Sequence, residues 1–464
     1  MDVKGKRVLV VGLGKSGIAS ALFLADRGAR VAVSDTKSAE ELHHEIPLLL
    51  DHGIVVEAGY HGERTFKEQE LIVISPGVPA DVPQLLQARQ AGIPVIGEVE
   101  LAARYLKGQI VAITGSNGKT TTTTLAGEII AASGRETLVG GNIGTPAISF
   151  VDSATAETWI VLEVSSFQLE TIETFHPKIA VVLNVTPDHL DRHHTFENYA
   201  AAKLRVFENQ TGSDFAVLNA DDSTCVAMAD KTQATVYWFS RLHAVEHGAF
   251  VRGDSILWRD ADSEVTIMPV AEISLKGAHN VENVLAGVCA GMLVGVDPSD
   301  IRRAVASFTA VEHRLEYVAT IRGVHFYNDS KATNVDATIK AVESFPGGLH
   351  LILGGKDKGS DYSVLNPLLE KRVKRVYTIG SAASKIESQV RGTEVISAGT
   401  IDNAVRRATE SAVLGDVVLL APACASFDQF VSYEHRGRVF KDLVRQMEAR
   451  EVQPTGSGRA GGKK

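Results

Sequence analysis

The chain of 464 residues is poor in cysteine, in long apolar runs and in excess positive charge. Its cysteines, Cys225, Cys289 and Cys424, lie far apart without the paired spacing of a zinc site or a disulfide framework. We interpret them as buried thiols of a reducing compartment. No apolar run is long enough to span a membrane, and the first is too short for a signal peptide. The net charge of −9 argues against a general nucleic-acid binder. We therefore expect a cytoplasmic protein, a monomer, with no nucleic-acid partner and no membrane insertion.

What is present is the composition of a globular protein, with 44% hydrophobic and 22% charged residues. Apolar runs alternate with helix-compatible runs, which predicts an α/β fold with mostly parallel, doubly wound sheets. We expect a Rossmann-like N-terminal domain over 1–97, a central phosphate-loop ATPase domain over 98–311 and a Rossmann-like C-terminal domain over 312–450. The tail at 451–464 is rich in Gly, Ser, Lys and Arg and is predicted to be disordered.

The most informative pattern is Thr-Gly-Ser-Asn-Gly-Lys-Thr at 114–120, between an apolar run and a helix-compatible run. Glycines let backbone N–H groups close around an anion, and the helix N-terminus adds partial positive charge. Lys119 would reach the outer phosphates of ATP, and the Thr120 hydroxyl would complete a Mg²⁺ shell. The generic motif has glycine where Ile113 stands, so an ordinary turn before an exposed lysine is the alternative. We expect ATP to contact Gly115, Ser116, Asn117, Gly118, Lys119, Thr120 and Thr121.

A second glycine-rich loop, Gly-Leu-Gly-Lys-Ser-Gly at 12–17, follows an apolar run at 7–11. A further predicted strand at 31–34 leads to Asp35, an acid about twenty residues beyond the glycines, as in dinucleotide-binding folds. Alone this pattern suggests NAD. The same geometry serves any diphosphate, including that of a UDP-sugar, and the sequence does not separate them. The loop after a predicted strand at 71–75 should lie at the same sheet edge.

Two acidic segments in the middle of the chain are candidates for metal ligands. Glu163 ends an apolar strand, where phosphate-loop enzymes hold Mg²⁺ through a carboxylate. The polar stretch at 188–194 has three interpretations: a zinc site of His189, Asp191 and His193, a Mg²⁺ or substrate site, or a loop without a ligand. Zinc takes a better defined ligand set, and an ATP loop upstream calls for Mg²⁺, so Mg²⁺ is favoured.

Downstream of this stretch, short strand-like pieces at 217–258 predict an antiparallel extension of the central sheet. The last third of the chain alternates helices with predicted strands at 324–327, 349–353, 375–379 and 417–420. Polar segments follow three of these strands, at 328–334, 354–359 and 422–430. Because the carboxyl ends of parallel strands meet at one sheet edge, these segments should cluster there.

Segments along most of the chain, in order from about residue 5 to 450, resemble those of Mur ligases: 114–120, 163–170, 188–191, 277–280, 313–314 and 328–334. The segments at 140–144 and 426–430 resemble the family member that adds D-glutamate. The resemblance also accounts for Ile113, because this family uses its own shorter loop pattern.

The resemblance implies three domains and an ATP-dependent amide ligase of peptidoglycan precursor synthesis. UDP-N-acetylmuramoyl-L-alanine, D-glutamate and ATP would become the dipeptide product, ADP and phosphate. The substrate carboxylate would attack the γ-phosphate to give an acyl phosphate, and the D-glutamate amine would then displace phosphate. The N-terminal glycine loop would hold UDP rather than NAD.

The resemblance also assigns site residues. For the UDP substrate they are Gly14, Lys15, Ser16, Asp35, Thr36, Ser75, Gly77, Asn142, Ser165 and Gln168. Further ATP contacts would come from Asn283, Arg314, Asp329 and Lys331. D-glutamate would be received by Thr333, Lys358, Ser426 and Tyr433, the last carrying a hydroxyl on the expected aromatic ring.

The resemblance implies two Mg²⁺ ions, the first held by Thr120 and Glu163 and the second partly by His189. Lys203 matches a lysine that this family carbamylates; a neutral amine that adds CO₂ becomes a carboxylate able to ligate Mg²⁺. Its alternative is an ordinary surface lysine on a helix. Catalysis would then depend on Lys119, His189 and Lys203.

Three other functions are weighed against this one. A sister ligase would keep the phosphate loop but change the pocket around Lys358 and Ser426, and folylpolyglutamate synthetase has no UDP-type N-terminal domain. An NAD-dependent dehydrogenase leaves the Lys119 loop unexplained, and a non-catalytic nucleotide-binding regulator would bind ATP without turnover.

ATP contacts drawn from two domains imply that the domains close on ATP, with a predicted hinge at 309–313.

Overall fold

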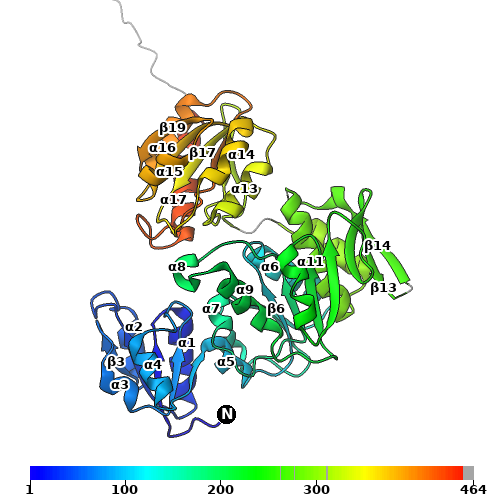
Figure 1. Ribbon diagram of the computed structural model, residues 1–464. Coiled ribbons are helices and arrows are strands. Elements are labelled where there is room, and N and C mark those ends of the chain that lie inside the picture. Colours follow the sequence, from blue (N-terminus) through cyan, green and yellow to red (C-terminus); the bar gives the residue numbers. More distant parts are fainter. Residues whose placement is uncertain (262, 276, 310–311, 453–464) are drawn as a thin grey trace, which may run out of the picture. The chain divides into compact units, whose positions relative to one another are not determined.

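The structure, a computed structural model, describes residues 1–261, 263–275, 277–309 and 312–452 (Figure 1). The chain divides into two compact units. The first unit holds Met1–Ser274 and Asn280–Phe308, and the second holds Leu275–His279 and the chain from Thr309 onward. Three mostly parallel sheets organise them, so the predicted α/β fold class is confirmed. Most of the predicted disordered tail (453–464) and residues 310–311 of the predicted hinge lie outside the described residues.

The first sheet has five parallel strands in the order β3-β2-β1-β4-β5, so the strand order reverses at β1. Strands β1 and β4 read as almost continuous apolar runs, as expected for a parallel sheet covered on both faces. The strands are β1 (Arg7–Val11), β2 (Arg30–Asp35), β3 (Val55–Ala58), β4 (Leu71–Ile74) and β5 (Val95–Gly97). The helices are α1 (Lys15–Asp26), α2 (Glu45–Asp51), α3 (Glu63–Lys67), α4 (Pro83–Gln90) and α5 (Glu98–Ala103).

The second sheet has nine strands in the order β14-β13-β12-β11-β10-β9-β6-β8-β7. The strands are β6 (Gln109–Thr114), β7 (Thr137–Gly141), β8 (Trp159–Glu163), β9 (Ile179–Val182), β10 (Phe215–Asn219), β11 (Thr235–Ser240), β12 (Gly248–Arg252), β13 (Ser255–Asp260) and β14 (Ser263–Pro269). The helices and 3₁₀ turns are α6 (Lys119–Ala132), η1 (Ala147–Phe150), α7 (Ser166–Leu169), α8 (Leu190–His193), α9 (Phe196–Leu204), η2 (Arg205–Phe207), α10 (Ser223–Val226), η3 (Ala229–Lys231), η4 (Val270–Glu272), α11 (Ala278–Val294) and α12 (Pro298–Ser307).

The prediction of an antiparallel extension at 217–258 is wrong for most of that segment. Strands β10, β11 and β12 pair in parallel, and antiparallel pairing begins only between β12 and β13. The physical reason is the connection between β10 and β11. The short turns α10 and η3 form a crossover there, which returns the chain to the same sheet edge and makes the next strand parallel.

The third sheet, in the second unit, has the order β15-β16-β20-β17-β18-β19, with only the β15–β16 pair antiparallel. Its strands are β15 (Glu316–Ile321), β16 (Val324–Asn328), β17 (Leu349–Gly354), β18 (Val373–Ile379), β19 (Glu394–Gly399) and β20 (Val417–Leu420). Its helices and 3₁₀ turn are α13 (Val335–Glu343), η5 (Ser363–Leu365), α14 (Asn366–Arg372), α15 (Ala383–Gln389), α16 (Ile401–Ser411) and α17 (Tyr433–Val452).

Within the first unit, one apolar core includes residues of both sheets, among them Val10, Leu24, Ile148 and Leu162. The buried Glu98, at the start of α5, accepts a hydrogen bond from the backbone N–H of Ile148 in η1 at 2.8 Å. The first two sheets are therefore joined by packing as well as by the chain. Across the described part of the chain, every helix is too short or too polar to cross a membrane.

Candidate functional site

The loop between β6 and α6 has the form of a phosphate cradle and depends on its glycines. Gly115 and Gly118 have φ values of +150° and +84°, which side chains rarely allow. A Cβ atom on Gly118 would also lie 2.2 Å from Oδ1 of Asn283. The loop then enters the 14-residue helix α6, whose N-terminal N–H groups favour an anion.

Residues that follow β9 hold this loop in place. The backbone N–H of Asn117 donates to Oδ1 of Asn184 at 2.9 Å, and Nδ2 of Asn184 donates back to the Asn117 carbonyl at 3.1 Å. Oγ of Ser116 donates to the carbonyl of Thr186 at 2.9 Å and lies 3.1 Å from the Tyr199 hydroxyl. A loop fixed from outside is preorganised for a ligand rather than free to collapse.

Two lysines meet beneath the loop. Nζ of Lys119 donates to the carbonyls of Gly115 and Ser116 at 2.8 and 2.9 Å, and Nζ of Lys203 donates to the same Gly115 carbonyl at 2.8 Å. Lys203 is 1% exposed and lies over the Tyr199 ring. Burial, helped by the Lys119 ammonium, holds the pKa of the Lys203 amine well below its usual 10.5. Lys203 is therefore no surface lysine, and its lowered pKa favours the neutral form of the amine, which is a nucleophile.

A hydroxyl and a carboxylate face each other beside the lysines. Oγ1 of Thr120 donates to Oε2 of Glu163 at 2.7 Å, and Nδ2 of Asn142 donates to Oε1 of Glu163 at 2.9 Å. All-oxygen donors at the mouth of a phosphate loop are the set that Mg²⁺ prefers. The residues present therefore fit a Mg²⁺ ion.

The predicted zinc alternative at 188–194 is wrong. His193 is turned into packing contacts, with Nε2 3.0 Å from Oγ of Ser166, Nδ1 3.2 Å from Oε1 of Glu170, and its ring stacked on Phe167. His189 has a left-handed φ of +54° and lies 3.6 Å from the Asp188 carboxylate. The tight turn sends the two histidines to different partners, which separates the ligands that zinc would need.

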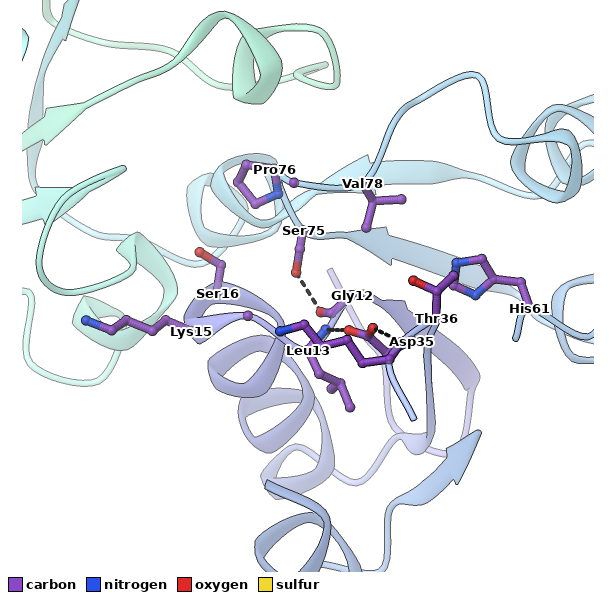
Figure 2. A pocket seen from close by; sticks show the side chains of 13 residues that line it. Gly12, Leu13, Lys15, Ser16, Asp35, Thr36, His61, Ser75, Pro76 and Val78 are labelled. Atoms are coloured by element: carbon purple, nitrogen blue, oxygen red, sulfur yellow. Dashed lines mark hydrogen bonds between the residues drawn. The ribbon is translucent and has the colours of Figure 1, made fainter. Parts of the chain in front are cut away.

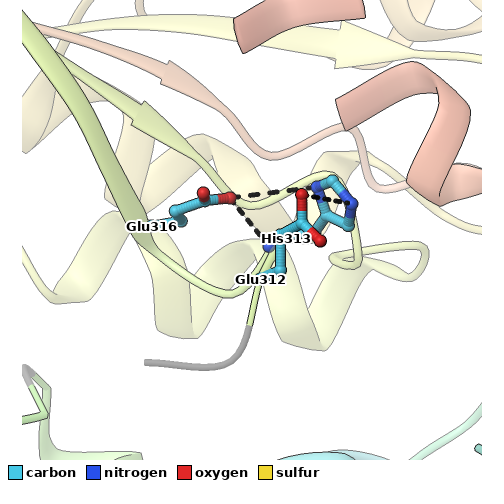
Figure 3. Close-up of side chains that lie close together, drawn as sticks. All are labelled: Glu312, His313 and Glu316. Carbon is cyan, nitrogen blue, oxygen red and sulfur yellow. Dashed lines mark hydrogen bonds and ion pairs between the residues drawn. The ribbon is translucent and has the colours of Figure 1, made fainter. Parts of the chain in front are cut away.

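Within the described residues, the one group of three acidic, imidazole or thiol side chains whose ligand atoms lie close together is Glu312, His313 and Glu316, in the second unit (Figure 3). The ammonium of Lys441 contacts both glutamates, at 2.5 Å from Glu312 and 2.9 Å from Glu316. The Lys441 ammonium thus supplies the positive charge between the two glutamates, so we interpret this cluster as a structural ion-pair network.

A separate cavity of about 350 Å³ opens at the carboxyl ends of β1, β2 and β4, beside the point where the strand order reverses (Figure 2). Seven predicted substrate residues line it: Gly14, Lys15, Ser16, Asp35, Thr36, Ser75 and Gly77. Oδ2 of Asp35 accepts the Leu13 N–H at 2.6 Å and Oδ1 accepts the Lys37 N–H at 2.8 Å. Asp35 therefore fixes the glycine loop to β2.

The other three predicted substrate residues lie elsewhere in the first unit. Asn142 is at Glu163, while Ser165 and Gln168 form a capping box at the start of α7. Gln168 is 2% exposed, and its Nε2 has no hydrogen-bond partner among the described residues. The structure thus gathers seven of the ten residues in one cavity, while Asn142 lies at Glu163 and Gln168 lines a smaller pocket together with Ser75 and Pro76.

In the second unit, the loops after β16, β17 and β20 meet at one sheet edge, as expected from their order. The backbones of Lys356 and Ala425 exchange hydrogen bonds of 2.8 and 3.1 Å, which links the loop carrying Lys358 to the loop carrying Ser426. Nζ of Lys331 lies 5.1 Å from the centre of the Tyr433 ring. Thr333 belongs to the first of these loops, and its N–H donates to the Lys331 carbonyl at 2.8 Å.

Two charged groups of that edge have unsatisfied buried atoms. Nε of Arg314 and Oδ1 of Asp329 have no hydrogen-bond partner within the described residues. Burial raises the pKa of Asp329 to about 6, against the opposing effect of Arg314. Buried polar groups are usually paired, so these two atoms could bond to a ligand.

The comparisons with known proteins agree along the chain. The Mur ligase MurD-like N-terminal domain matches residues 6–97, the Mur ligase middle domain matches 113–291, and the Mur ligase glutamate ligase domain matches 313–424. The UDP-N-acetylmuramoylalanine--D-glutamate ligase of Koribacter versatilis is 68% identical over 97% of this chain and 100% of its own length. The protein of the same name from Acidobacterium capsulatum is 62% identical over 96% of this chain and 97% of its own length.

The chain belongs to the Mur ligase family.

Solved structures support the fold. The UDP-N-acetylmuramate-alanine ligase of Thermotoga maritima has a TM-score of 0.61 at 18% identity, over 95% of this chain and 99% of its own. A pseudomurein peptide ligase type C of Methanothermus fervidus has the same TM-score and identity, over 96% and 100%. Mur ligases use ATP and Mg²⁺, which agrees with the phosphate loop and the Thr120–Glu163 pair.

Sequence reasoning missed two residues that shape this Mur ligase's sites. His61 lines the N-terminal cavity but belongs to no motif and follows a strand that was not predicted. Arg436, fully buried at the start of α17, donates to Ser330, Cys424, Ala425 and Gly354. It ties the three loops of the second unit together; only the pattern of an arginine soon after the 422–430 segment could have drawn attention to it.

Proposed function

We propose that this Mur ligase joins D-glutamate to UDP-N-acetylmuramoyl-L-alanine at the expense of ATP, through an acyl-phosphate intermediate. The observation that carries the proposal is the group of side chains beneath the phosphate loop. Lys119 and the buried Lys203 both donate to the Gly115 carbonyl, and beside them the Thr120 hydroxyl donates to the Glu163 carboxylate. The proposal is supported by relatives up to 68% identical that bear the name of this activity.

The reaction has two displacements. The substrate carboxylate attacks the γ-phosphorus, the bond to the bridging oxygen breaks, and ADP leaves. The D-glutamate amine then attacks the acyl carbon, and phosphate leaves with one former carboxylate oxygen while the amine loses a proton. Two anions must approach in the first displacement, so the Lys119 ammonium beneath the loop lowers the barrier by neutralising their charge. Bound Mg²⁺ would supply further charge neutralisation at the phosphate oxygens.

We assign two Mg²⁺ ions to this site as part of the proposal. Thr120 and Glu163 would hold the first, while His189 and Lys203 would hold the second. An ammonium beside a metal is unfavourable, whereas a buried neutral amine can add CO₂ and become a carboxylate. The depressed pKa and full burial of Lys203 support carbamylation.

The substrates would be recognised by groups from both units. The UDP portion would occupy the cavity that Gly14 to Ser16, Asp35 and Ser75 line, with Asn142, Ser165 and Gln168 toward the reacting end. ATP would meet Asn283, Arg314, Asp329 and Lys331, and D-glutamate would meet Thr333, Lys358, Ser426 and Tyr433. The unsatisfied atoms of Arg314 and Asp329 support the ATP contacts. We propose that the enzyme works as a monomer in the cytoplasm.

The test is phosphate release from ATP and Mg²⁺ in the presence of UDP-N-acetylmuramoyl-L-alanine, with amino acids added one at a time. Release that requires both the UDP substrate and D-glutamate is the expected result. Release with a different amino acid would assign a sister reaction and contradict the proposed specificity. Absence of release with every amino acid would contradict the ligase proposal itself.

A further inference from the structure

The end of the N-terminal cavity beyond Thr36 is formed by an imidazole ring. His61 lines this cavity, and Figure 2 shows its ring turned toward Thr36, at the end opposite Lys15. The ring packs edge-on against Phe66, with centroids 5.5 Å apart. Its backbone is also fixed, because Nε2 of Gln84 donates to the His61 carbonyl at 3.1 Å. The ring is therefore a positioned part of the wall.

A hydrogen-bond chain behind the ring determines which nitrogen carries the proton. Oγ of Ser34 lies 2.8 Å from Nδ1 of His61 and 2.9 Å from Oε2 of Glu57. A hydroxyl has one hydrogen, and a carboxylate can only accept, so the Ser34 hydroxyl donates to Glu57. Ser34 then accepts from Nδ1–H of His61. The more distant Tyr60 carbonyl, at 3.3 Å, is the weaker acceptor for that hydroxyl.

The second ring nitrogen is consequently a bare acceptor. Burial lowers the pKa of His61 below its usual 6.5, against the opposing effect of Asp35 and Glu57, so the ring is neutral at physiological pH. Nε2 has no hydrogen-bond partner among the described residues. A neutral imidazole with Nδ1–H bound offers one lone pair, at Nε2, and nothing to donate there.

We infer that His61 is a specificity residue for the nucleoside end of the substrate, accepting at Nε2 a hydrogen bond from an N–H or O–H of that nucleoside. The inference rests on the proposed function, because it takes the cavity to hold UDP. Uracil offers such a donor at N3–H, and ribose offers its hydroxyls. Cytosine has a lone pair at N3, which would oppose the lone pair of Nε2. The relay from Glu57 through Ser34 thus turns a titratable side chain into a fixed acceptor.

The test is the affinity of the full-length protein for UDP by titration calorimetry, with three variants. His61→Leu removes the acceptor at similar size, and His61→Gln keeps an acceptor oxygen on a side chain of similar reach. The matched control is His52→Leu, an exposed histidine on the same domain whose Nδ1 bonds only the Leu48 carbonyl. Thermal unfolding establishes that each variant is folded. CDP and 2′- and 3′-deoxy-UDP are titrated alongside to identify the donor.

We expect His61→Leu to weaken UDP binding roughly three- to tenfold, the value of one neutral hydrogen bond. His61→Gln should stay within about twofold of the wild type, and His52→Leu should be unchanged. If the base is the donor, the wild-type protein should bind UDP more tightly than CDP, and His61→Leu should bind the two equally. If the ribose is the donor, the same should hold for UDP and one of the deoxy analogues.

Two results would overturn the inference while leaving the proposed function intact. One is UDP binding by His61→Leu equal to that of the wild type. The other is weakened binding with the wild-type affinity differences among these nucleotides preserved, which would make His61 a shape element only. Failure of the wild-type protein to bind UDP would instead contradict the proposed function and remove the inference with it.

Discussion

At the scale of single residues, two lysines of the site share one acceptor, because the carbonyl of Gly115 accepts hydrogen bonds from both Lys119 and Lys203. Two ammonium groups on one carbonyl repel, and burial together with this repulsion lowers the pKa of the Lys203 amine. The two lysines therefore have different tasks. In the proposed reaction, Lys119 would supply charge to the phosphates, and Lys203 would supply the nitrogen that adds CO₂.

Lys119→Ala should lower turnover by about a thousandfold or more, because a positioned charge acts on the transferring phosphate. The fold should change little, since the loop is also held by Asn184. The measurement is ATP- and substrate-dependent phosphate release, together with the unfolding temperature. Lys107→Ala, an exposed lysine outside the site, is the control. Wild-type turnover by Lys119→Ala would remove the proposed role.

Lys203→Ala should be nearly inactive and should regain part of its turnover when a small carboxylate such as formate is added. The added anion can replace the carboxylate that carbamylation would provide. Lys119→Ala serves as the matched control, because an anion cannot replace an ammonium there. Full activity of Lys203→Ala without added carboxylate would make the residue structural.

Glu98 gives the first unit a pH-dependent stability. Burial raises the pKa of Glu98 from 4.5 to about 7. The folded state therefore holds this proton more tightly, so its stabilising effect is complete below pH 4.5 and is lost as the pH rises to about 7. The loss is on the order of 3 kcal/mol.

Glu98→Gln, which keeps the acceptor for the Ile148 N–H, should remove this dependence and make the protein more stable than the wild type at pH 8. The measurement is the free energy of unfolding of the variant minus that of the wild type, from pH 4.5 to 8. Glu40→Gln, an exposed glutamate, is the control. A difference that stays constant with pH would contradict the assignment.

At the scale of elements, helix α1 is packed unusually close to the loop that precedes it. A Cβ atom on Gly17 would lie 1.8 Å from the Gly12 carbonyl oxygen and 2.7 Å from Oγ of Ser75. The third glycine of the 12–17 pattern thus sets the distance between helix and strand. This close approach brings the helix N-terminus to the cavity.

Gly17→Ala should therefore lower the free energy of unfolding of the first unit by about 1–3 kcal/mol, the usual cost of overpacking. The measurement is chemical denaturation followed by circular dichroism. Gly77→Ala is the control, because a Cβ there meets nothing within 4 Å and its φ is not left-handed. Equal stabilities of the two variants would show that α1 can move away without cost.

The sequence predicted those elements whose signals are local. Strands β1 and β4 are apolar runs, and the loops after β1, β6, β16, β17 and β20 carry recognisable polar motifs. Strand β3 was missed because Val55–Ala58 is short and mixes apolar with charged residues. His61 was missed for the same reason, because it follows β3 and only the folded arrangement of the strands places it at the cavity.

Local sequence patterns also do not predict the direction in which strands pair, or a side chain that bonds to several distant loops. The parallel pairing of β10 with β11 depends on where the connection between these two strands crosses the sheet. Arg436 is buried because carbonyls from three distant loops converge on it, and its only local signal is its place soon after the 422–430 segment. The seven cavity residues were predictable because they belong to loops that end parallel strands.

At the scale of the whole molecule, the candidate site residues are divided between two compact units. The phosphate loop and the N-terminal cavity belong to the first unit, whereas Lys331, Lys358 and Ser426 belong to the second. The proposed reaction would need groups from both units.

The two units should therefore close on their substrates, with a hinge at 309–313. Small-angle scattering should give a smaller radius of gyration with a non-hydrolysable ATP analogue and UDP-N-acetylmuramoyl-L-alanine than without them. The Lys119→Ala variant, with weakened phosphate contacts, should close less. Superimposable profiles with and without ligands would contradict closure.

The most direct test of the proposed reaction follows the atoms. UDP-N-acetylmuramoyl-L-alanine labelled with a heavy oxygen isotope in its carboxylate is incubated with ATP, Mg²⁺ and D-glutamate, and the released phosphate is analysed by mass spectrometry. An acyl-phosphate route predicts one labelled oxygen in each phosphate, and release only when D-glutamate is present. Unlabelled phosphate would mean that water or another group attacks ATP, and would contradict the account.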